Sequence, residues 1–200
     1  GVDVVTRSTV DLGVIEQLDP DVVVVATGSG PRHVDVEGAE EAHVVDALAV
    51  LRGEANVGSS VVIADWRCDW VGLGLAEKLA RDGCRVRLCS NGYMAGQTIQ
   101  QYVRDSWLGT MHRLGVELIP MARLFGADQD SVYFQHTTSN EPLICEDVDT
   151  LVLSMGSQSE RALVDALEEW SGEWHAIGDC LAPRTCEEAV LEGLKVGTEV

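Results

Sequence analysis

The stretch that decides the fold is Ser60–Ser90, SVVIADWRCDWVGLGLAEKLARDGCRVRLCS. An apolar strand at Ser60–Ala64 leads into an amphipathic helix at Trp70–Asp82, and a second apolar strand follows at Arg85–Cys89. Gly83 ends the predicted helix, at a position where a left-handed cap residue is favoured. This strand–helix–strand order has the length of one βαβ unit of a Rossmann fold. It predicts two parallel strands with a helix packed against them.

The loop after the first strand lacks the glycines that a dinucleotide site needs. Those glycines let the backbone approach a pyrophosphate at the start of the helix. The sequence instead places Asp65, Trp66 and Asp69 there, and Gly72 falls inside the predicted helix. Carboxylates would repel phosphates, so we expect Asp69 to cap the helix itself. We predict that Asp65, Trp66, Asp69 and Gly72 form a degenerate nucleotide loop that binds no nucleotide.

Strand-like and helix-like segments alternate along the rest of the chain, as in an α/β sheet covered by helices. Further strands are predicted at Val2–Val5, Val22–Ala26, Glu117–Ile119, Thr150–Ser154 and His175–Ile177, and further helices at Val45–Leu51, Thr98–Leu114, Glu160–Glu169 and Cys186–Glu199. Between Met121 and Val148, short strands and turns predict an antiparallel meander. We expect one lobe inserted into another, with residues 1–31 and 175–200 in the first and residues 32–174 in the second.

The composition excludes several classes of protein. The 200 residues include 33 acids and 14 bases, a formal net charge of −19, and 46% hydrophobic residues. The hydrophobic share excludes disorder as the main state, and the acidic surface argues against nucleic acid as a partner. No apolar run approaches the ~18 residues of a membrane span, and no signal peptide is visible. The six cysteines form no metal-binding pattern, so we predict free thiols, no metal site and a cytoplasmic location.

Two motifs flank the central unit. DPDVVVVATGSGP, at Asp19–Pro31, predicts a buried strand that ends in Ala26-Thr27-Gly28, and WHAIGDCLAPRTCEEAVLEGLKVG, at Trp174–Gly197, a strand that ends in Gly178-Asp179 before a helix. Glycine allows close backbone approach, and a carboxylate accepts hydrogen bonds from hydroxyls. Both motifs resemble the paired signatures of two-dinucleotide-binding-domain flavoproteins. That resemblance implies that Ala26, Thr27, Gly28, Gly178 and Asp179 contact FAD.

The resemblance narrows to one family. VVIADWRCDWVGLGLAEKLARDGCRV and IGDCLAPRTCEEAVLEG are similar to the C-terminal half of the trimethylamine dehydrogenase and 2,4-dienoyl-CoA reductase family, the Old Yellow Enzyme-like NADH:flavin oxidoreductases. The resemblance covers nearly the whole chain. It implies a three-layer Rossmann-like FAD/NAD(P)-binding α/β domain with an antiparallel β-meander, plus remnants of a second, incomplete FAD-type lobe. It also implies a parent protein with an FMN and 4Fe-4S barrel before this region, and FAD or ADP within it.

Dienoyl reductases of this family keep the glycines for NADPH, and this chain departs from them, as the amine dehydrogenase and N-demethylase branch does. We therefore expect a fragment of a flavin-dependent oxidoreductase that oxidises or demethylates an N-methylated amine or reduces an enoyl-type substrate. The fragment alone is expected to be inactive, with no catalytic residue and no tightly bound cofactor. The implied partners are the missing N-terminal barrel, the other half of the FAD domain and an electron-transfer flavoprotein.

Two other functions remain open. The chain could be the NAD(P)H-binding reductase domain of a disulfide-reductase-like flavoprotein, with an altered loop. It could also be a non-catalytic interaction module, with a degenerate Rossmann lobe that docks a partner near Trp66 and Trp70.

Overall fold

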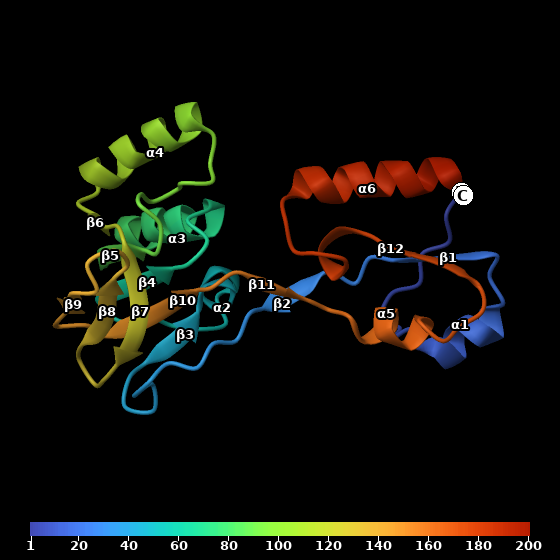
Figure 1. The fold of residues 1–200 in the computed structure, drawn as a ribbon, viewed down its shortest axis with the longest axis horizontal. Helices are drawn as coiled ribbons and strands as arrows, with labels where there is room; N and C mark the ends of the chain where they lie inside the picture. The colour runs from blue at the N-terminus through green and yellow to red at the C-terminus, as the bar shows by residue number, and fades with distance from the viewer. The chain divides into compact units, whose positions relative to one another are not determined.

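The computed structural model describes residues 1–200 and divides them into two compact units (Figure 1). Unit 1 consists of Gly1–Gly30 and Ser157–Val200, and unit 2 is Pro31–Gly156. The chain returns to unit 1 at Ser157, whereas we expected the return at residue 175. The reason is helix α5 (Ala162–Leu167), whose Val164 and Leu167 are buried with Ile15 and Val25 in the core of unit 1.

Unit 2 is built on a five-stranded sheet in the order β3-β10-β4-β5-β6. Every neighbouring pair in this sheet is parallel. Its strands are β3 (Val44–Asp46), β10 (Thr150–Ser154), β4 (Ser60–Asp65), β5 (Arg85–Ser90) and β6 (Glu117–Ile119). Every residue of the central strand β4 is buried, which is why its sequence is a continuous apolar run without alternation.

Helices cover one face of this sheet and a meander covers the other. Val61 and Ile63 of β4 pack with the helices α2 (Ala47–Arg52), α3 (Trp70–Arg81) and α4 (Gln101–Arg113). Val62 and Ala64 face the other way, toward the antiparallel strands β7 (Ala122–Ala127), β8 (Val132–His136) and β9 (Pro142–Cys145). The predicted three-layer α/β fold with its meander is therefore confirmed.

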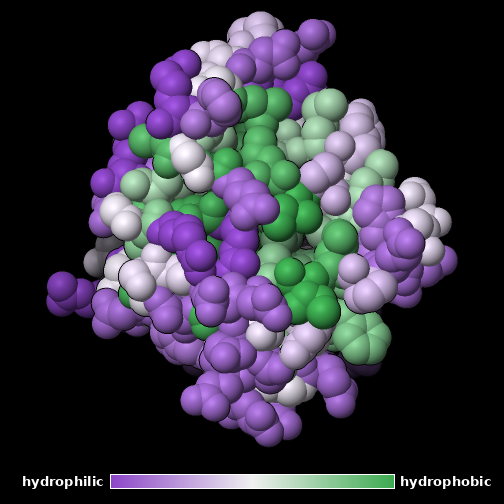
Figure 2. All heavy atoms as spheres, turned by 90° about the vertical axis from the view of Figure 1, so that its left-hand side faces the viewer, coloured by the Kyte–Doolittle hydropathy of each residue, from purple (hydrophilic) through white to green (hydrophobic).

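The outer strands of unit 2 leave some apolar side chains in solvent. Exposed examples are Leu118 of β6, Phe125 of β7 and Ile144 of β9. Figure 2 shows apolar patches of this kind within an otherwise hydrophilic face.

Unit 1 contains one parallel strand pair, β1 (Val22–Val25) with β12 (Glu173–Ala176). Its helices are α1 (Leu12–Leu18), α5, the 3₁₀ helix η1 (Gly178–Cys180) and α6 (Cys186–Glu199). Cys180 is fully buried in the same core as Ile15 and Val25. Where the chain passes between the units, the short strands β2 (Ser29–Pro31) and β11 (Ser157–Ser159) pair with each other.

Among the predicted elements that differ from the structure, two have a clear local cause. The strand predicted at Val2–Val5 is wrong, because this segment has no regular structure and its valines are at least 80% exposed. A strand needs a neighbour to bond with its backbone, and this segment has none. The helix predicted at Val45–Leu51 begins only at Ala47, because the Asp46 carboxylate caps it by accepting from the N–H groups of Leu48 and Ala49.

None of the helices is long and apolar enough to cross a membrane.

Candidate nucleotide-binding site

The loop after β4 presents a carboxylate to the start of α3. Asp69 Oδ1 accepts a hydrogen bond from Val71 N at 3.0 Å, and Asp69 Oδ2 pairs with Arg67 Nε at 3.0 Å. The predicted helix cap is thus confirmed. The negative side chain lies at the positive end of the helix dipole, which is the position that a phosphate takes in a dinucleotide site.

Asp65 fills the space above the first turn of the same helix. Its side chain is buried, its Oδ1 accepts from Cys68 N at 3.0 Å, and its Oδ2 has no hydrogen-bond partner. A Cβ placed on Gly72 would lie 2.3 Å from Asp65 Oδ2, so only glycine fits at that position. Gly72 therefore makes room for a carboxylate of this chain.

Burial changes the acidity of Asp65. Loss of hydration is the main cause that raises the pKa of this carboxyl from 3.8 to about 7, and the nearby Asp69 carboxylate adds to the effect. The N–H of Cys68 opposes it by bonding the charged form. Asp65 therefore titrates near neutral pH. Asp65 and Asp69 accept hydrogen bonds from the N–H groups of Cys68 and Val71 at the start of the helix.

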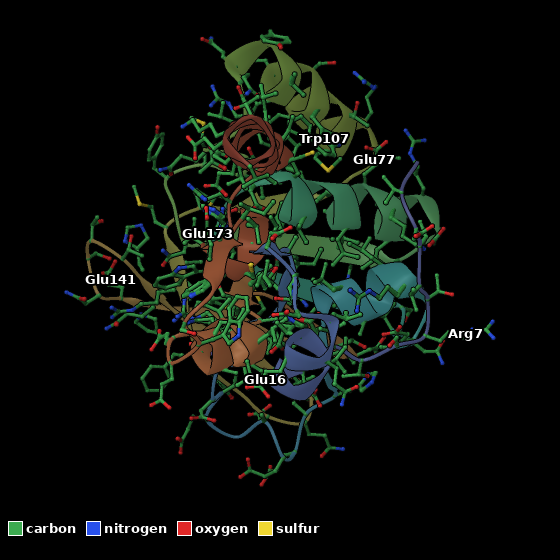
Figure 3. All side chains as sticks on the ribbon, turned by 90° about the vertical axis from the view of Figure 1, so that its right-hand side faces the viewer. Arg7, Glu16, Glu77, Trp107, Glu141 and Glu173 are labelled. Carbon is green, nitrogen blue, oxygen red and sulfur yellow. The ribbon has the colours of Figure 1, made fainter.

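The two tryptophans of the loop are half exposed, Trp66 at 45% and Trp70 at 48%. The Arg32 guanidinium lies 5.9 Å from the centre of the Trp66 ring. Trp70 packs at 5.6 Å against Trp107 of α4, whose Nε1 donates to Glu77 Oε2 at 2.6 Å (Figure 3). Each indole is thus held by a specific neighbour within unit 2.

Unit 1 holds a separate cleft of about 440 Å³ at the carboxyl ends of β1 and β12. Because the two strands are parallel and adjacent, the two predicted motifs meet at one edge. Ala26 and Gly28 line the cleft from the first motif, and Gly178 and Asp179 from the second. The start of α6 closes its other side, and there Thr185 caps the helix in a capping box with Glu188.

Two glycines leave the backbone bare in this cleft. Gly28 has φ +79° and Gly178 has φ +66°, in the left-handed region that favours glycine. A Cβ at Gly28 would meet nothing within 4 Å, and one at Gly178 would meet only Ala189 Cβ at 3.6 Å. The conformation therefore requires glycine, and the space above each glycine is open to a ligand.

Asp179 is oriented by two hydrogen bonds. Its Oδ2 accepts from Ser29 Oγ at 2.8 Å, and its Oδ1 accepts from Arg184 N at 3.2 Å. Each carboxylate oxygen can accept a further hydrogen bond, so Asp179 can still bind a ligand hydroxyl. Thr27 Oγ1 donates to the carbonyl of Glu160 at 2.8 Å and holds the turn in place.

Two residues that hold the cleft lining in place were not predicted from the sequence. Ser29 bonds Asp179, and Glu192 of α6 accepts from Gly178 N at 2.7 Å and from the guanidinium of Arg184. These two bonds hold the pKa of Glu192 below its usual range. Glu192 lies about two helical turns after the cap residue Thr185, on the same face of α6. This spacing is the sequence signal that could have identified Glu192.

The chain is similar to several known oxidoreductases. Bilirubin reductase of Mediterraneibacter gnavus is 28% identical over 90% of this chain and 27% of that protein. N,N-dimethylglycine/sarcosine dehydrogenase of Chromohalobacter salexigens is 23% identical over 98% of this chain and 34% of that protein. No family model matches the chain.

Solved structures agree in fold. Histamine dehydrogenase from Rhizobium sp. 4-9 superimposes with a TM-score of 0.87 at 18% identity, over 96% of this chain and 32% of that one. 2-Naphthoyl-CoA reductase does so with a TM-score of 0.85 at 23% identity, over 97% and 29%. The chain is similar to members of the trimethylamine dehydrogenase and 2,4-dienoyl-CoA reductase family. The resemblance predicted from the sequence is confirmed.

The two motifs of unit 1 that resemble paired FAD signatures lie in one region. Ala26 and Gly28 of the first motif and Gly178 and Asp179 of the second line one cleft. The degenerate loop, with Asp65, Trp66, Asp69 and Gly72, belongs to unit 2. The chain spans 27% and 34% of the length of the two relatives named above.

Proposed function

We propose that this chain is the nucleotide-binding-like region of a flavin-dependent oxidoreductase. In this proposal, unit 1 holds FAD or ADP in the cleft at the ends of β1 and β12, and unit 2 binds no dinucleotide. The observation that carries the proposal is the meeting of two bare left-handed glycines, Gly28 and Gly178, beside the carboxylate of Asp179. A nucleotide needs close backbone approach for its phosphates and an acceptor for its hydroxyls, and this edge offers both.

Each residue of the cleft has a distinct task in this proposal. Asp179, held by Ser29 and the backbone of Arg184, would accept hydrogen bonds from ribityl or ribose hydroxyls. The Arg184 side chain is the one cation that lines the cleft, and its pairing with Glu192 would position it near a phosphate. When bound, the flavin would supply hydride and electron transfer. The residues of this chain bind and orient the nucleotide.

For the whole protein, we propose oxidation or demethylation of an N-methylated amine, or reduction of an enoyl-type substrate, at a flavin outside this chain. The dehydrogenase and reductase names of the relatives support this range of reactions. An FMN and 4Fe-4S barrel, the other half of the FAD domain and an electron-transfer flavoprotein would complete the system. Incubating the whole protein anaerobically with dimethylglycine, dimethylamine or an enoyl-CoA should bleach its flavin absorbance, and a protein without flavin would contradict the proposal.

Nucleotide titration tests the role of unit 1 directly. Calorimetric titration of the chain with ADP and with FAD should show saturable binding that Asp179→Asn weakens about tenfold or more, as expected for the loss of a charged acceptor. Glu16→Gln, on the exposed face of α1 in the same unit, is the matched control and should bind like the unchanged chain. Equal affinity in the Asp179 variant, or no binding of either nucleotide, would contradict the proposal.

Titration with NADH and NADPH separates the proposal from the reductase alternative. We expect no binding at micromolar concentrations, because Asp65 and Asp69 occupy the helix start in unit 2. Micromolar affinity for either coenzyme would favour the NAD(P)H-binding reductase domain. The half-exposed indoles of Trp66 and Trp70 keep the interaction module as a further candidate, which a stable complex abolished by Trp70→Ser would support.

A further inference from the structure

Unit 2 contains a second cleft, on the face of the sheet opposite α3. Its volume is about 140 Å³, and its floor is apolar, formed by Ala64, Ala122, Leu124 and Met155. Trp66 and Phe125 flank it, and Arg32 and Arg123 also line it. Nothing in the proposed nucleotide site of unit 1 involves these residues.

The cleft lies where the strand order reverses. From β4 the sheet runs through β5 to β6 on one side and through β10 to β3 on the other. Ala64 and Trp66 mark the carboxyl end of β4, and Met155 follows β10 directly. In open parallel sheets, ligands bind outside the carboxyl ends of the strands at such a reversal. The cleft is therefore at the position where an α/β sheet most often holds a small molecule.

The charges around the cleft favour an anion. Neither Arg32 nor Arg123 forms an ion pair: Arg32 lies over the Trp66 ring, and Arg123 donates to the side-chain oxygen of Gln135. Asp35 is the one exposed carboxylate in the lining. Asp65 also lines the cleft, but its carboxylate lies against Gly72 of α3, on the helix side of the sheet. Two guanidinium groups without an ion pair therefore lie beside one cleft, although the chain has a net charge of −19.

The volume of the cleft suits a single ring. An apolar cavity of roughly 150 Å³ accommodates benzene, whereas sites for drug-sized molecules begin near 300 Å³. A ring would contact the apolar floor and the flanking aromatic side chains, and a guanidinium would bind an attached acidic group with two parallel hydrogen bonds. We propose that this cleft binds a small aromatic anion, a single ring that bears one carboxylate or phosphate group.

Matched ligands test the proposal on the full chain. Titrations followed by ligand-observed NMR should show saturable binding of benzoate or phenyl phosphate and none of benzylamine, which has a similar ring with the opposite charge. Whether benzoate or phenyl phosphate binds more tightly distinguishes a carboxylate from a phosphate ligand. If benzylamine binds as well as both anions, or if neither anion binds up to about 10 mM, the proposal is overturned.

Charge-matched variants locate the binding. The double variant Arg32→Gln/Arg123→Gln should bind the preferred anion at least about tenfold more weakly. Arg52→Gln/Arg81→Gln removes the same net charge from exposed positions of α2 and α3 and should bind normally. All four side chains are exposed, so both variants should fold, which thermal unfolding checks. An unchanged affinity in the first variant, or equal losses in both, would overturn the site, whereas the ADP titration of unit 1 tests the proposed function separately.

Discussion

The carboxylate of Asp65 lies directly above the backbone of Gly72, so a Cβ at Gly72 would be 2.3 Å from Asp65 Oδ2. One residue ends β4 and the other lies in the first turn of α3. In a dinucleotide site this space belongs to the ligand and to bare glycine backbone. Here the Asp65 side chain occupies this space, so the packing of β4 against α3 depends on the absence of a side chain at Gly72.

Gly72→Ala should destabilise unit 2, because the new methyl group must displace a buried carboxylate. We expect a loss of about 1–3 kcal/mol in the free energy of unfolding, the usual cost of overpacking a core. Urea unfolding followed by circular dichroism measures it. Gly74→Ala is the control in the same helix, since its Cβ would meet only Trp107 at 3.7 Å. That change should be neutral or stabilising, and equal losses in the two variants would contradict the role of Gly72.

The acidity of Asp65 should make stability depend on pH. Its pKa rises from 3.8 to about 7 in the folded chain, so the folded chain keeps a proton that the unfolded chain releases. The stability contribution of this group is therefore fully present below pH 3.8 and is lost as the pH rises through about 7. Asp65→Asn cannot ionise and should be more stable than the unchanged chain at pH 8 by on the order of 3 kcal/mol. Unfolding curves at pH 5 and pH 8 measure the difference between the two chains, which should shrink at pH 5.

Other carboxylates oppose this trend, because hydrogen bonds hold the pKa values of Asp128, Asp149 and Glu192 below their usual range. The comparison of the variant with the unchanged chain cancels their contribution. A constant difference between pH 5 and pH 8 would contradict the titration of Asp65 in this range.

Thiol reactivity should single out one cysteine. Cys186 is exposed, whereas Cys68, Cys89, Cys145 and Cys180 are buried and Cys84 is partly buried. Burial also raises the pKa of Cys68 to about 11, which leaves little thiolate at neutral pH. A thiol reagent such as dithiobis-nitrobenzoate should therefore react rapidly with one thiol of the native chain. Cys186→Ser should abolish the fast phase, and a fast phase that survives this change would contradict the assignment.

Thr185→Ala should weaken the start of α6. Thr185 Oγ1 accepts from Glu187 N at 3.3 Å, and Thr185 N donates to Glu188 Oε2 at 2.9 Å. Loss of such a cap costs about 1 kcal/mol, which urea unfolding detects. Thr185→Ser retains the hydroxyl and should retain most of the stability. Because Thr185 also lines the cleft of unit 1, the alanine variant should bind ADP more weakly as well.

Local features of this chain could be predicted from its sequence. The strand–helix–strand at Ser60–Ser90 and the cap at Asp69 depend on neighbouring residues, and both are confirmed. The contact of Asp65 with Gly72 was missed because it depends on how closely α3 packs on β4. The strand predicted at Val2–Val5 failed for a similar reason, since strand formation needs a distant partner that a local pattern cannot reveal.

The candidate site was predictable in outline. The two motifs were recognised by resemblance, and parallel pairing of β1 with β12 brings them together. Ser29 and Glu192 were missed because their roles arise only when the turn after β1 and the helix α6 reach the same cleft. The return to unit 1 at Ser157 depends on α5 packing against Ile15 and Val25, a contact between segments far apart in sequence.

The pairing of β2 with β11 means that unit 2 begins and ends at one place. Arg32 N donates to the carbonyl of Gly156 at 3.0 Å, so a hydrogen bond joins the two ends of unit 2. Because the ends of unit 2 are adjacent, a short glycine linker can replace the whole unit without distorting unit 1. Joining Gly30 to Ser157 would leave a continuous unit 1, and fusing the ends of unit 2 would permit circular permutation. The pairing of two three-residue strands is therefore what allows unit 2 to be removed or permuted as a module.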